Sequence, residues 1–457
     1  MKKLNVVILA AGAGKRMQSA LPKVLHTLAG IPLLMHVINA ARLLSPDKIC
    51  VVVGYGSDKV RQLTGSDDLI WVSQELQLGT GHALMQALPQ LNTDGFTLVL
   101  YGDVPLVRIE TLQQLIAIAG EKNCALLTAL IDNPFGYGRV LRDLKTGEVV
   151  AIVEQKDATD EQQKIREINT GIMLIPNECL HRWLPKLDNK NTQHEYYLTD
   201  IVAMAVEDGL HVASSEVENF WEVMGVNNKQ QLAELERIYQ KNCAERLLDK
   251  GVSLRDPNRI DIRGGLTCGS DVEIDVNCIF EGTVRLGDSV RIGAHCILKD
   301  VTVASGSIIH PFSLIEDTEI GEDCKIGPYA RIRPGTRLAK KVHIGNFVEV
   351  KNSQIAAASK ANHLSYIGDS TVGENVNIGA GTITCNYDGA NKYRTIIEDD
   401  VFIGSDTQLI APVKIAKGST IGAGSTITKE TPENQLTLSR SKQVSITGWK
   451  RPQKSKA

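Results

Sequence analysis

The sequence lacks the features that would place a protein in a membrane or in an oxidising compartment. Its longest nearly uninterrupted apolar run, Leu4 to Ala13, has about half the length that a membrane-spanning helix needs. The nine cysteines include no Cys-x-x-Cys pair, and their odd number argues against a disulfide framework or a zinc cluster. A net charge of −3 gives no reason to expect nucleic acid as a partner. We therefore expect a cytoplasmic protein with reduced thiols that is not an integral membrane protein.

Aromatic residues are also scarce, at 5%, whereas the 39 glycines suit a chain that turns often. With 457 residues, 43% of them hydrophobic and 23% charged, several folded domains are expected rather than a disordered chain. Residues 1–227 alternate short apolar strands with helix-like stretches, which predicts a parallel α/β sheet. Residues 228–250 show helical periodicity and predict a linker helix. Residues 251–457 follow a different pattern and form a separate domain in this prediction.

That pattern is an internal repeat with a period of six residues. Apolar residues recur in register in three runs: Ile274, Phe280, Leu286, Ile292 and Leu298; Leu314, Ile320, Ile326, Ile332, Leu338, Ile344 and Val350; and Ile397, Ile403, Leu409, Ile415, Ile421 and Ile427. Seven consecutive matches make chance improbable, and a parallel β-helix is the architecture that such a repeat predicts. The register breaks at residues 353–362 and 381–394, where we expect loops that carry function.

A glycine-rich turn follows the first predicted strand, at residues 10–17. A turn at the carboxyl end of a strand can present backbone N–H groups to phosphate. A Rossmann fingerprint would need glycine at Met17, and a Walker A loop would need glycine at Leu9, so neither motif is present. The pattern Leu-Ala-Ala-Gly-x-Gly-x-Arg-Met, followed by Leu-Pro-Lys at residues 21–23, resembles the sugar-nucleotidyltransferase family.

The resemblance covers essentially the whole chain. Further matching segments lie at residues 74–82, 101–103, 136–139, 169–171, 225–227 and 360–366. Together they resemble the family of bifunctional N-acetylglucosamine-1-phosphate uridyltransferase/glucosamine-1-phosphate N-acetyltransferase enzymes. The resemblance implies an N-terminal Rossmann-like nucleotidyltransferase domain, a linker helix and a C-terminal left-handed parallel β-helix of hexapeptide repeats with a basic tail. It also implies a homotrimer.

The same resemblance implies the activity. Acetyl transfer from acetyl-CoA to glucosamine 1-phosphate is followed by uridylyl transfer from UTP to N-acetylglucosamine 1-phosphate, with release of pyrophosphate. The product is UDP-N-acetylglucosamine, a precursor of peptidoglycan and lipopolysaccharide. UTP and acetyl-CoA are co-substrates and Mg²⁺ is the cofactor. Phosphoryl-type transfer needs positioning and neutralised phosphate charge more than covalent catalysis, which agrees with such a set of groups.

In the N-terminal domain, the resemblance assigns Arg16 and Lys23 to the triphosphate and Asp103 and Asn227 to Mg²⁺. The UTP and UDP-sugar contacts that it implies are Leu9, Ala10, Ala11, Gly12, Lys23, Gln74, Gly79, Thr80, Tyr101, Gly102, Asp103, Gly138, Glu154, Asn169 and Asn227. One departure is Lys15, where the family usually has threonine. This extra cation either alters triphosphate affinity or points outward.

In the C-terminal domain, the reaction needs a base, because only a neutral amine can attack a thioester. The resemblance assigns that role to His363. It assigns the glucosamine 1-phosphate contacts to Arg333, Lys351, Tyr366 and Asn377. The acetyl-CoA contacts that it implies are Ala380, Asn386, Tyr387, Ser405, Ala423 and Arg440.

Two other functions share this two-part architecture. One is a single-activity pyrophosphorylase resembling ADP-glucose pyrophosphorylase, in which the β-helix serves regulation. The other is a non-catalytic nucleotide-exchange subunit of translation initiation. Arg16, Lys23 and Asp103 count against the non-catalytic protein, and His363 counts against the single-activity enzyme.

Overall fold

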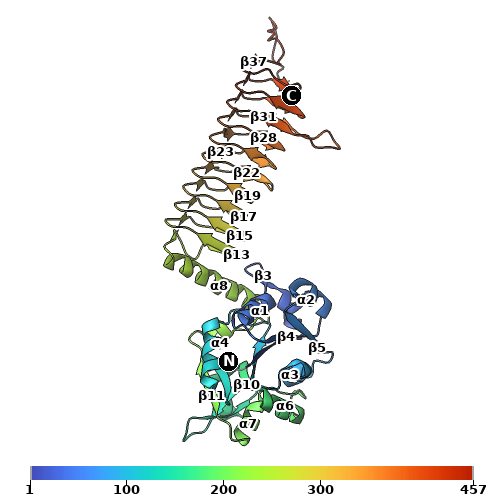
Figure 1. Cartoon of the computed structure of the whole chain (residues 1–457), viewed down its shortest axis with the longest axis vertical. Helices are drawn as coiled ribbons and strands as arrows, with labels where there is room; N and C mark the ends of the chain where they lie inside the picture. The colour runs from blue at the N-terminus through green and yellow to red at the C-terminus, as the bar shows by residue number, and fades with distance from the viewer. Residues whose placement is uncertain (1–2, 455–457) are drawn as a thin grey trace. The chain divides into compact units, whose positions relative to one another are not determined.

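The computed structural model describes residues 3–454 and divides the chain into two compact units, the first ending at Tyr239 and the second beginning at Gln240. The first unit is built on a mostly parallel sheet with strand order β11-β7-β10-β6-β1-β4-β5, and β8 and β9 extend it beside β10 (Figure 1). Its strands are β1 (Leu4–Ala10), β4 (Lys48–Val53), β5 (Leu69–Ser73), β6 (Phe96–Tyr101), β7 (Cys124–Leu130), β8 (Arg139–Arg142), β9 (Val149–Val153), β10 (Glu167–Pro176) and β11 (Val212–Glu216), and the short pair β2 (Thr27–Leu28) and β3 (Ile31–Pro32) lies apart from it.

Helices cover both faces of this sheet, because its strands are apolar on both sides. Val6 and Ile8 of β1 enter one core and Val7 and Leu9 enter the other. The helices are α1 (Leu33–Leu43), α2 (Ser57–Thr64), α3 (Thr80–Ala87), α4 (Ile109–Ala119), α5 (Asp160–Gln163), α6 (Asn177–Trp183) and α7 (Asp200–Glu207). Since β1, β4 and β6 run parallel, their carboxyl ends meet at one edge of the sheet. The glycine-rich turn and Asp103 follow two of those ends.

Helix α8 (Lys229–Asp249) contributes one half to each unit. In its first half, Leu235 is fully buried in a small core with Met17, Leu28 and Leu33. In its second half, the side chain of Gln240 bonds both the N–H and the C=O of Ile262, at 2.7 and 2.9 Å. No helix within residues 3–454 is both long and apolar enough to cross a membrane.

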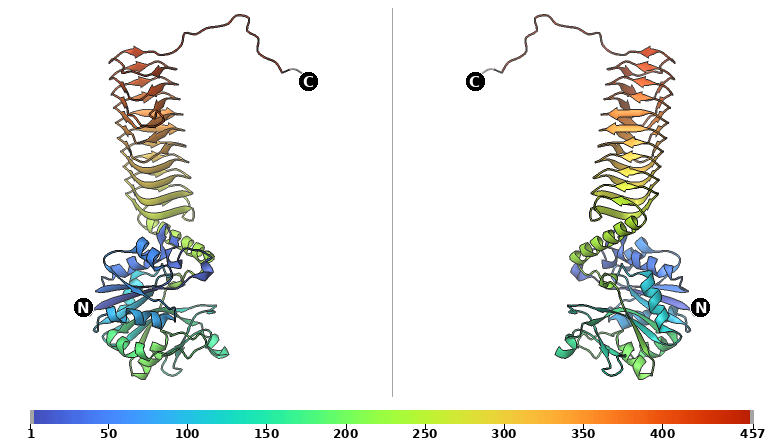
Figure 2. Two further views of the ribbon diagram at one scale, coloured as in Figure 1. Left: turned by 90° about the vertical axis from the view of Figure 1, so that its right-hand side faces the viewer. Right: turned by 90° about the vertical axis from the view of Figure 1, so that its left-hand side faces the viewer.

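The second unit is a parallel β-helix whose short strands stack coil upon coil (Figure 2). One face consists of β12 (Ser253–Leu254), β14 (Glu273–Ile274), β16 (Arg291–Ile292), β18 (Ile308–Ile309), β20 (Lys325–Ile326), β23 (His343–Asn346), β26 (Lys360–His363), β29 (Asn377–Ile378), β32 (Phe402–Ile403), β35 (Thr420–Ile421) and β37 (Leu436–Thr437). The remaining faces begin as the long strands β13 (Ile260–Cys268), β15 (Cys278–Leu286), β17 (Ile297–Val303) and β19 (Leu314–Ile320).

Above β19 these long strands divide into two stacks. The first stack is β21 (Arg331–Ile332), β24 (Glu349–Lys351), β27 (Tyr366–Gly368), β30 (Ile383–Cys385), β33 (Gln408–Ile410) and β36 (Thr426–Ile427). The second is β22 (Thr336–Leu338), β25 (Gln354–Ile355), β28 (Ser370–Val372), β31 (Thr395–Ile397) and β34 (Val413–Ile415).

The period-six prediction of the core is confirmed except at one position. Leu314 is only partly buried, whereas Ile315 beside it is fully buried. The reason is that a coil can be one residue short: buried positions are five residues apart between Leu298 and Val303 and again between Ile315 and Ile320. A run counted strictly in sixes therefore starts one residue early.

The two expected loops have different outcomes. Residues 353–362 form no loop, because β25 and β26 lie there in register with their neighbours. The break in the period comes instead from another five-residue step, from Val350 to Ile355. Of residues 381–394, Ile383–Cys385 stay in the coil as β30, whereas residues 386–394 leave it. The Tyr387–Lys392 bridge closes the loop that projects beside β31 (Figure 1).

Candidate functional site

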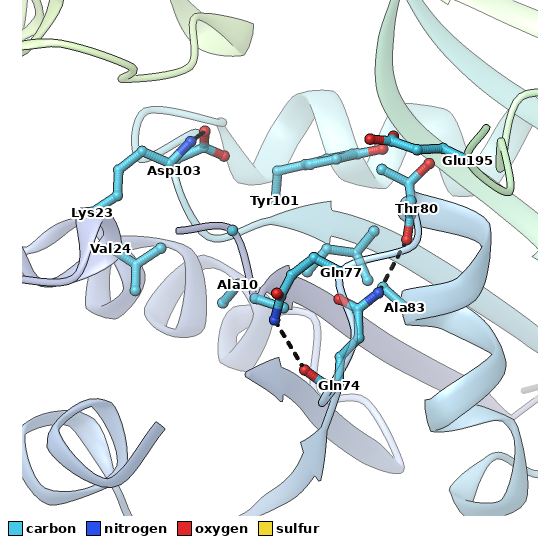
Figure 3. Close-up of a pocket in the computed structure, with 14 residues that line it drawn as sticks. Ala10, Lys23, Val24, Gln74, Gln77, Thr80, Ala83, Tyr101, Asp103 and Glu195 are labelled. Atoms are coloured by element: carbon cyan, nitrogen blue, oxygen red, sulfur yellow. Dashed lines mark hydrogen bonds and ion pairs between the residues drawn. The ribbon is translucent and has the colours of Figure 1, made fainter. Parts of the chain in front are cut away.

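A pocket in the first unit lies at the carboxyl edge of the sheet (Figure 3). Many of the predicted nucleotide-binding residues line it, namely Leu9, Ala10, Ala11, Gly12, Lys23, Gln74, Gly79, Thr80, Tyr101 and Asp103. The N–H of Gly102 donates to the carbonyl of Leu9, so the ends of β6 and β1 are held together here. Segments far apart in sequence therefore meet at one pocket.

Cations and oxygen ligands converge at one end of the pocket. The Lys23 ammonium lies 2.5 Å from Asp103 Oδ2 and 3.3 Å from Asn227 Oδ1. Arg16 donates to the same Asn227 oxygen at 3.0 Å. Lys15 is exposed to solvent. Asp103 and Asn227 thus both present an oxygen, one from a carboxylate and one from an amide, toward the Lys23 ammonium.

A second side of the site is formed around Tyr101. The ring lies against Gly171, where an added Cβ would come within 2.5 Å of it. Burial raises the pKa of the Tyr101 phenol, and the charges of Glu154 and Asp103 raise it further. Gly138 lies against the Glu154 carboxylate, and the N–H of Asn169 donates to the Gly138 carbonyl at 2.9 Å. The residues predicted to bind the sugar are therefore gathered beside Tyr101.

Gln74 lies on the side of the pocket opposite Tyr101 (Figure 3) and is almost fully buried. Its Nε2 donates to the Gly79 carbonyl at 3.2 Å and lies 3.0 Å from His82 Nδ1. Gln77 and Glu195 also line the pocket and are not among the residues predicted from the sequence. Gln77 falls inside a matching segment, which was a usable signal. Glu195 belongs to no motif. It reaches the pocket because the N–H of Gly81 donates to the carbonyl of the next residue, Tyr196, at 2.8 Å.

The second unit places its predicted base in a row of corner residues. Successive coils turn through a residue with positive φ, among them Phe347, Leu364, Gly381, Asp406 and Gly424. The residues that immediately precede these turns along this edge form what we call the corner row: Ala294, Pro311, Pro328, Asn346, His363, Ala380, Ser405 and Ala423. His363 and three predicted acetyl-CoA contacts, Ala380, Ser405 and Ala423, thus occupy equivalent places in successive coils.

Positive charge gathers around Lys351 of β24. Arg333 pairs with Glu349 at 2.9 Å, and this hydrogen bond raises the pKa of Arg333. The pKa of Lys351 is lowered, chiefly because the Lys392 side chain lies against it, with Arg333 adding further positive charge. Lys392 comes from the projecting loop, and no sequence pattern singled it out. Three cations close together form a suitable site for a phosphate.

The other predicted residues of the second unit lie on several coils and faces of the β-helix. Tyr366 reaches over Gly368, where an added Cβ would meet both the Tyr366 hydroxyl and Asn386. Asn386 is buried and donates to Asp369, whereas Tyr387 on the loop is exposed. Arg440 donates to the Ala423 carbonyl at 3.0 Å, which joins two predicted acetyl-CoA contacts. Asn377 lies on the adjacent face, beside Lys360 of β26.

Comparison with known proteins gives matches over both units. Family profiles match the MobA-like NTP transferase domain at residues 6–250, the GMPPB C-terminal domain at residues 262–346 and the bacterial transferase hexapeptide (six repeats) at residues 394–429. The bifunctional protein GlmU of Nitrosospira multiformis is 67% identical over 454 residues, covering 99% of both chains. The bifunctional GlmU proteins of Nitrosomonas eutropha and Nitrosomonas europaea are each 64% identical over 457 residues, covering 100% of both chains. The chain therefore belongs to the GlmU family of bifunctional enzymes, which join a uridyltransferase to an acetyltransferase.

Proposed function

We propose that the two reactions divide between the units at α8, with uridylyl transfer in the first unit and acetyl transfer in the second. The observation that carries this proposal is that each unit gathers its own set of reactive groups. Lys23, Asp103 and Asn227 converge in the first unit. His363 stands in the corner row of the second.

In the first reaction, a sugar phosphate oxygen attacks the α-phosphorus of UTP and pyrophosphate leaves. Arg16 and Lys23 bind the triphosphate and offset its charge, while the Gln74, Gly79 and Thr80 side of the pocket holds the uracil. Gly138, Glu154 and Asn169 bind the N-acetylated sugar beside Tyr101. Such a reaction needs little covalent chemistry from the protein, and the site supplies mainly orientation and positive charge.

Asp103 and Asn227 would hold Mg²⁺, which supplies charge neutralisation at the phosphates when it is bound. Their fit to a cation is supported by the Lys23 ammonium, on which both oxygens converge. Within residues 3–454, no cluster of three or more His, Cys, Asp or Glu side chains forms a metal site. A sparse pair of oxygen ligands suits Mg²⁺, which keeps several waters and takes further ligands from phosphate.

In the second reaction, the glucosamine 1-phosphate amine attacks the thioester carbonyl of acetyl-CoA. His363 takes the amine proton, while Arg333, Lys351 and Lys392 bind the sugar phosphate and Tyr366 and Asn377 orient the ring. Ala380, Ser405 and Ala423 lie along the path of acetyl-CoA, with Asn386, Tyr387 and Arg440 beside it. Both co-substrates and the nine free cysteines support a cytoplasmic location.

A pair of variants of the full-length chain tests this division. Asp103→Ala should abolish pyrophosphate release from UTP and N-acetylglucosamine 1-phosphate but leave acetylation intact, because only the first site loses its carboxylate. His363→Ala should lower the kcat for CoA thiol release with glucosamine 1-phosphate by about 10²- to 10⁴-fold and leave uridylyl transfer unchanged. Loss of both activities in either variant would contradict separate sites.

We also propose a homotrimer assembled through the second unit. His295, Phe312, Tyr329 and Phe347 form an exposed aromatic stack, with ring centroids 4.8, 4.9 and 5.3 Å apart along the coils. All four stand at the positive-φ turn of their coil. An exposed row of aromatic side chains on four successive coils supports a contact surface here, and burial against a second copy would account for it.

A further inference from the structure

One member of the corner row below His363 differs from the others. The preceding coils have Ala294, Pro311 and Pro328 at this position, and none of these can hydrogen-bond through a side chain. The coil directly below His363 has Asn346 instead. Asn346 and His363 are Cα partners in the parallel pairing of β23 with β26. An amide thus stands one coil beneath the proposed base.

The two side chains are in contact. His363 Nδ1 lies 2.9 Å from Asn346 Oδ1. An amide oxygen can only accept a hydrogen bond, so the proton of the neutral imidazole is held on Nδ1. The lone pair is then on Nε2, the nitrogen that is free to take a proton from an amine. Asn346 therefore selects the tautomer that a general base needs.

The backbone alone would not hold the ring in place. Ser365 Oγ donates to the His363 carbonyl at 2.8 Å, and the N–H of Leu364 donates to the Asn346 carbonyl at 3.1 Å. These bonds fix the main chain, but the imidazole itself is exposed. Among the hydrogen bonds found within residues 3–454, the one to Asn346 is the only bond that the ring makes.

Groups that can carry positive charge lie near this corner. His343 on β23 is within electrostatic reach of His363, and Lys325, His310 and Lys360 also act on His343. The acceptor that the structure gives the Nδ1 proton is the amide oxygen of Asn346.

We propose that Asn346 is a positioning residue for acetyl transfer, which holds His363 in its Nδ1–H tautomer and orients Nε2 toward the amine. This inference rests on the proposed role of His363 as the base. In the step itself, the amine nitrogen forms a bond to the thioester carbonyl carbon and the carbon–sulfur bond breaks. The amine proton passes to His363 Nε2, and the CoA thiolate leaves and takes up a proton.

Two variants of the full chain test the role of Asn346. Asn346→Leu removes the acceptor and should lower acetyltransferase kcat by about 10- to 100-fold, with KM for both substrates within about threefold. Asn346→Asp keeps an acceptor for Nδ1–H and should retain kcat within a few-fold at its optimum. Its carboxylate also stabilises the imidazolium, so the acid limb of the kcat profile should move to higher pH.

Matched measurements separate this role from a structural one. Gln354→Leu makes the same kind of change at an exposed amide on β25 and should alter neither kcat nor the pH profile. Equal losses of kcat in Asn346→Asp and Asn346→Leu, or a fall in thermal stability parallel to the loss of kcat, would overturn the proposal. Full kcat in Asn346→Leu would also overturn it. If His363→Ala keeps its kcat, the base assignment itself is wrong, which is a distinguishable result.

Discussion

At the scale of single residues, Glu154 shows how the fold changes the chemistry of a carboxyl group. Burial raises the pKa of Glu154 above its ordinary value, and the hydrogen bond from Thr199 at 3.0 Å opposes this only in part. The folded state therefore binds this proton more tightly than the unfolded state. The resulting stabilisation is present below the unfolded pKa of about 4.3 and is lost as pH rises through the folded pKa. The ionised Glu154 carboxylate therefore lowers the stability of the fold at neutral pH. Its proposed contact with the sugar explains why a carboxyl group is present at this buried position.

We expect Glu154→Gln to raise the Tm of the first unit at about pH 7.5, because the buried charge is removed while an acceptor for Thr199 remains. The gain should shrink toward zero at about pH 4. The KM for N-acetylglucosamine 1-phosphate should rise about tenfold, since a hydrogen bond to a charged acceptor contributes about 1.5–3 kcal/mol. Scanning calorimetry measures the Tm, with the transition of the first unit identified as the one that UTP shifts. Steady-state kinetics measures the KM. Exposed Glu161→Gln serves as the control, and a Tm gain that is equal at both pH values would exclude charge as its cause.

At the scale of a structural element, the aromatic stack makes a prediction about assembly. Tyr329→Asp combined with Phe347→Asp places two charges in the proposed interface, and aspartate tolerates positive φ better than an aromatic residue does. We expect a monomer in sedimentation, because charges buried in the contact would disrupt it, and unchanged uridylyl transfer. Phe402→Asp on β32 changes an equally exposed aromatic residue outside the stack and should leave the trimer intact. A trimer that persists in the double variant would exclude the stack as its interface.

At the scale of the whole molecule, α8 determines where the chain can be cut. A fragment of residues 1–228 lacks Leu235, which is fully buried in the first unit. Losing a buried leucine costs about 2–5 kcal/mol, so this fragment should unfold at a lower urea concentration than a fragment of residues 1–249. The longer fragment should keep full uridylyl transfer. Urea titration and pyrophosphate release compare the two fragments, and equal midpoints would show that α8 adds nothing to the first unit.

Much of the architecture could be predicted from the sequence because it follows from local spacing. A buried side chain every six residues is visible in the chain itself, and it located nearly the whole β-helix core. The turn after β1 and the segments around Lys23 and Asp103 were likewise readable as motifs. Their meeting at one pocket follows from parallel strands, whose carboxyl ends share an edge.

The sequence by itself determined the two-part organisation, the repeat and the chemical character of both candidate sites. Only the tertiary structure decided which residues meet at a corner of the β-helix. Asn346, His363 and Ala380 are separated by 17 residues each, whereas Ala380 and Ser405 are separated by 25, because the projecting loop intervenes. Lys392, Glu195 and Asn346 join their sites through contacts between distant segments. Coils differ in length by single residues, yet their strands still pair in register. This register is set by pairing between segments distant in sequence, so a count of residues along the chain cannot predict it.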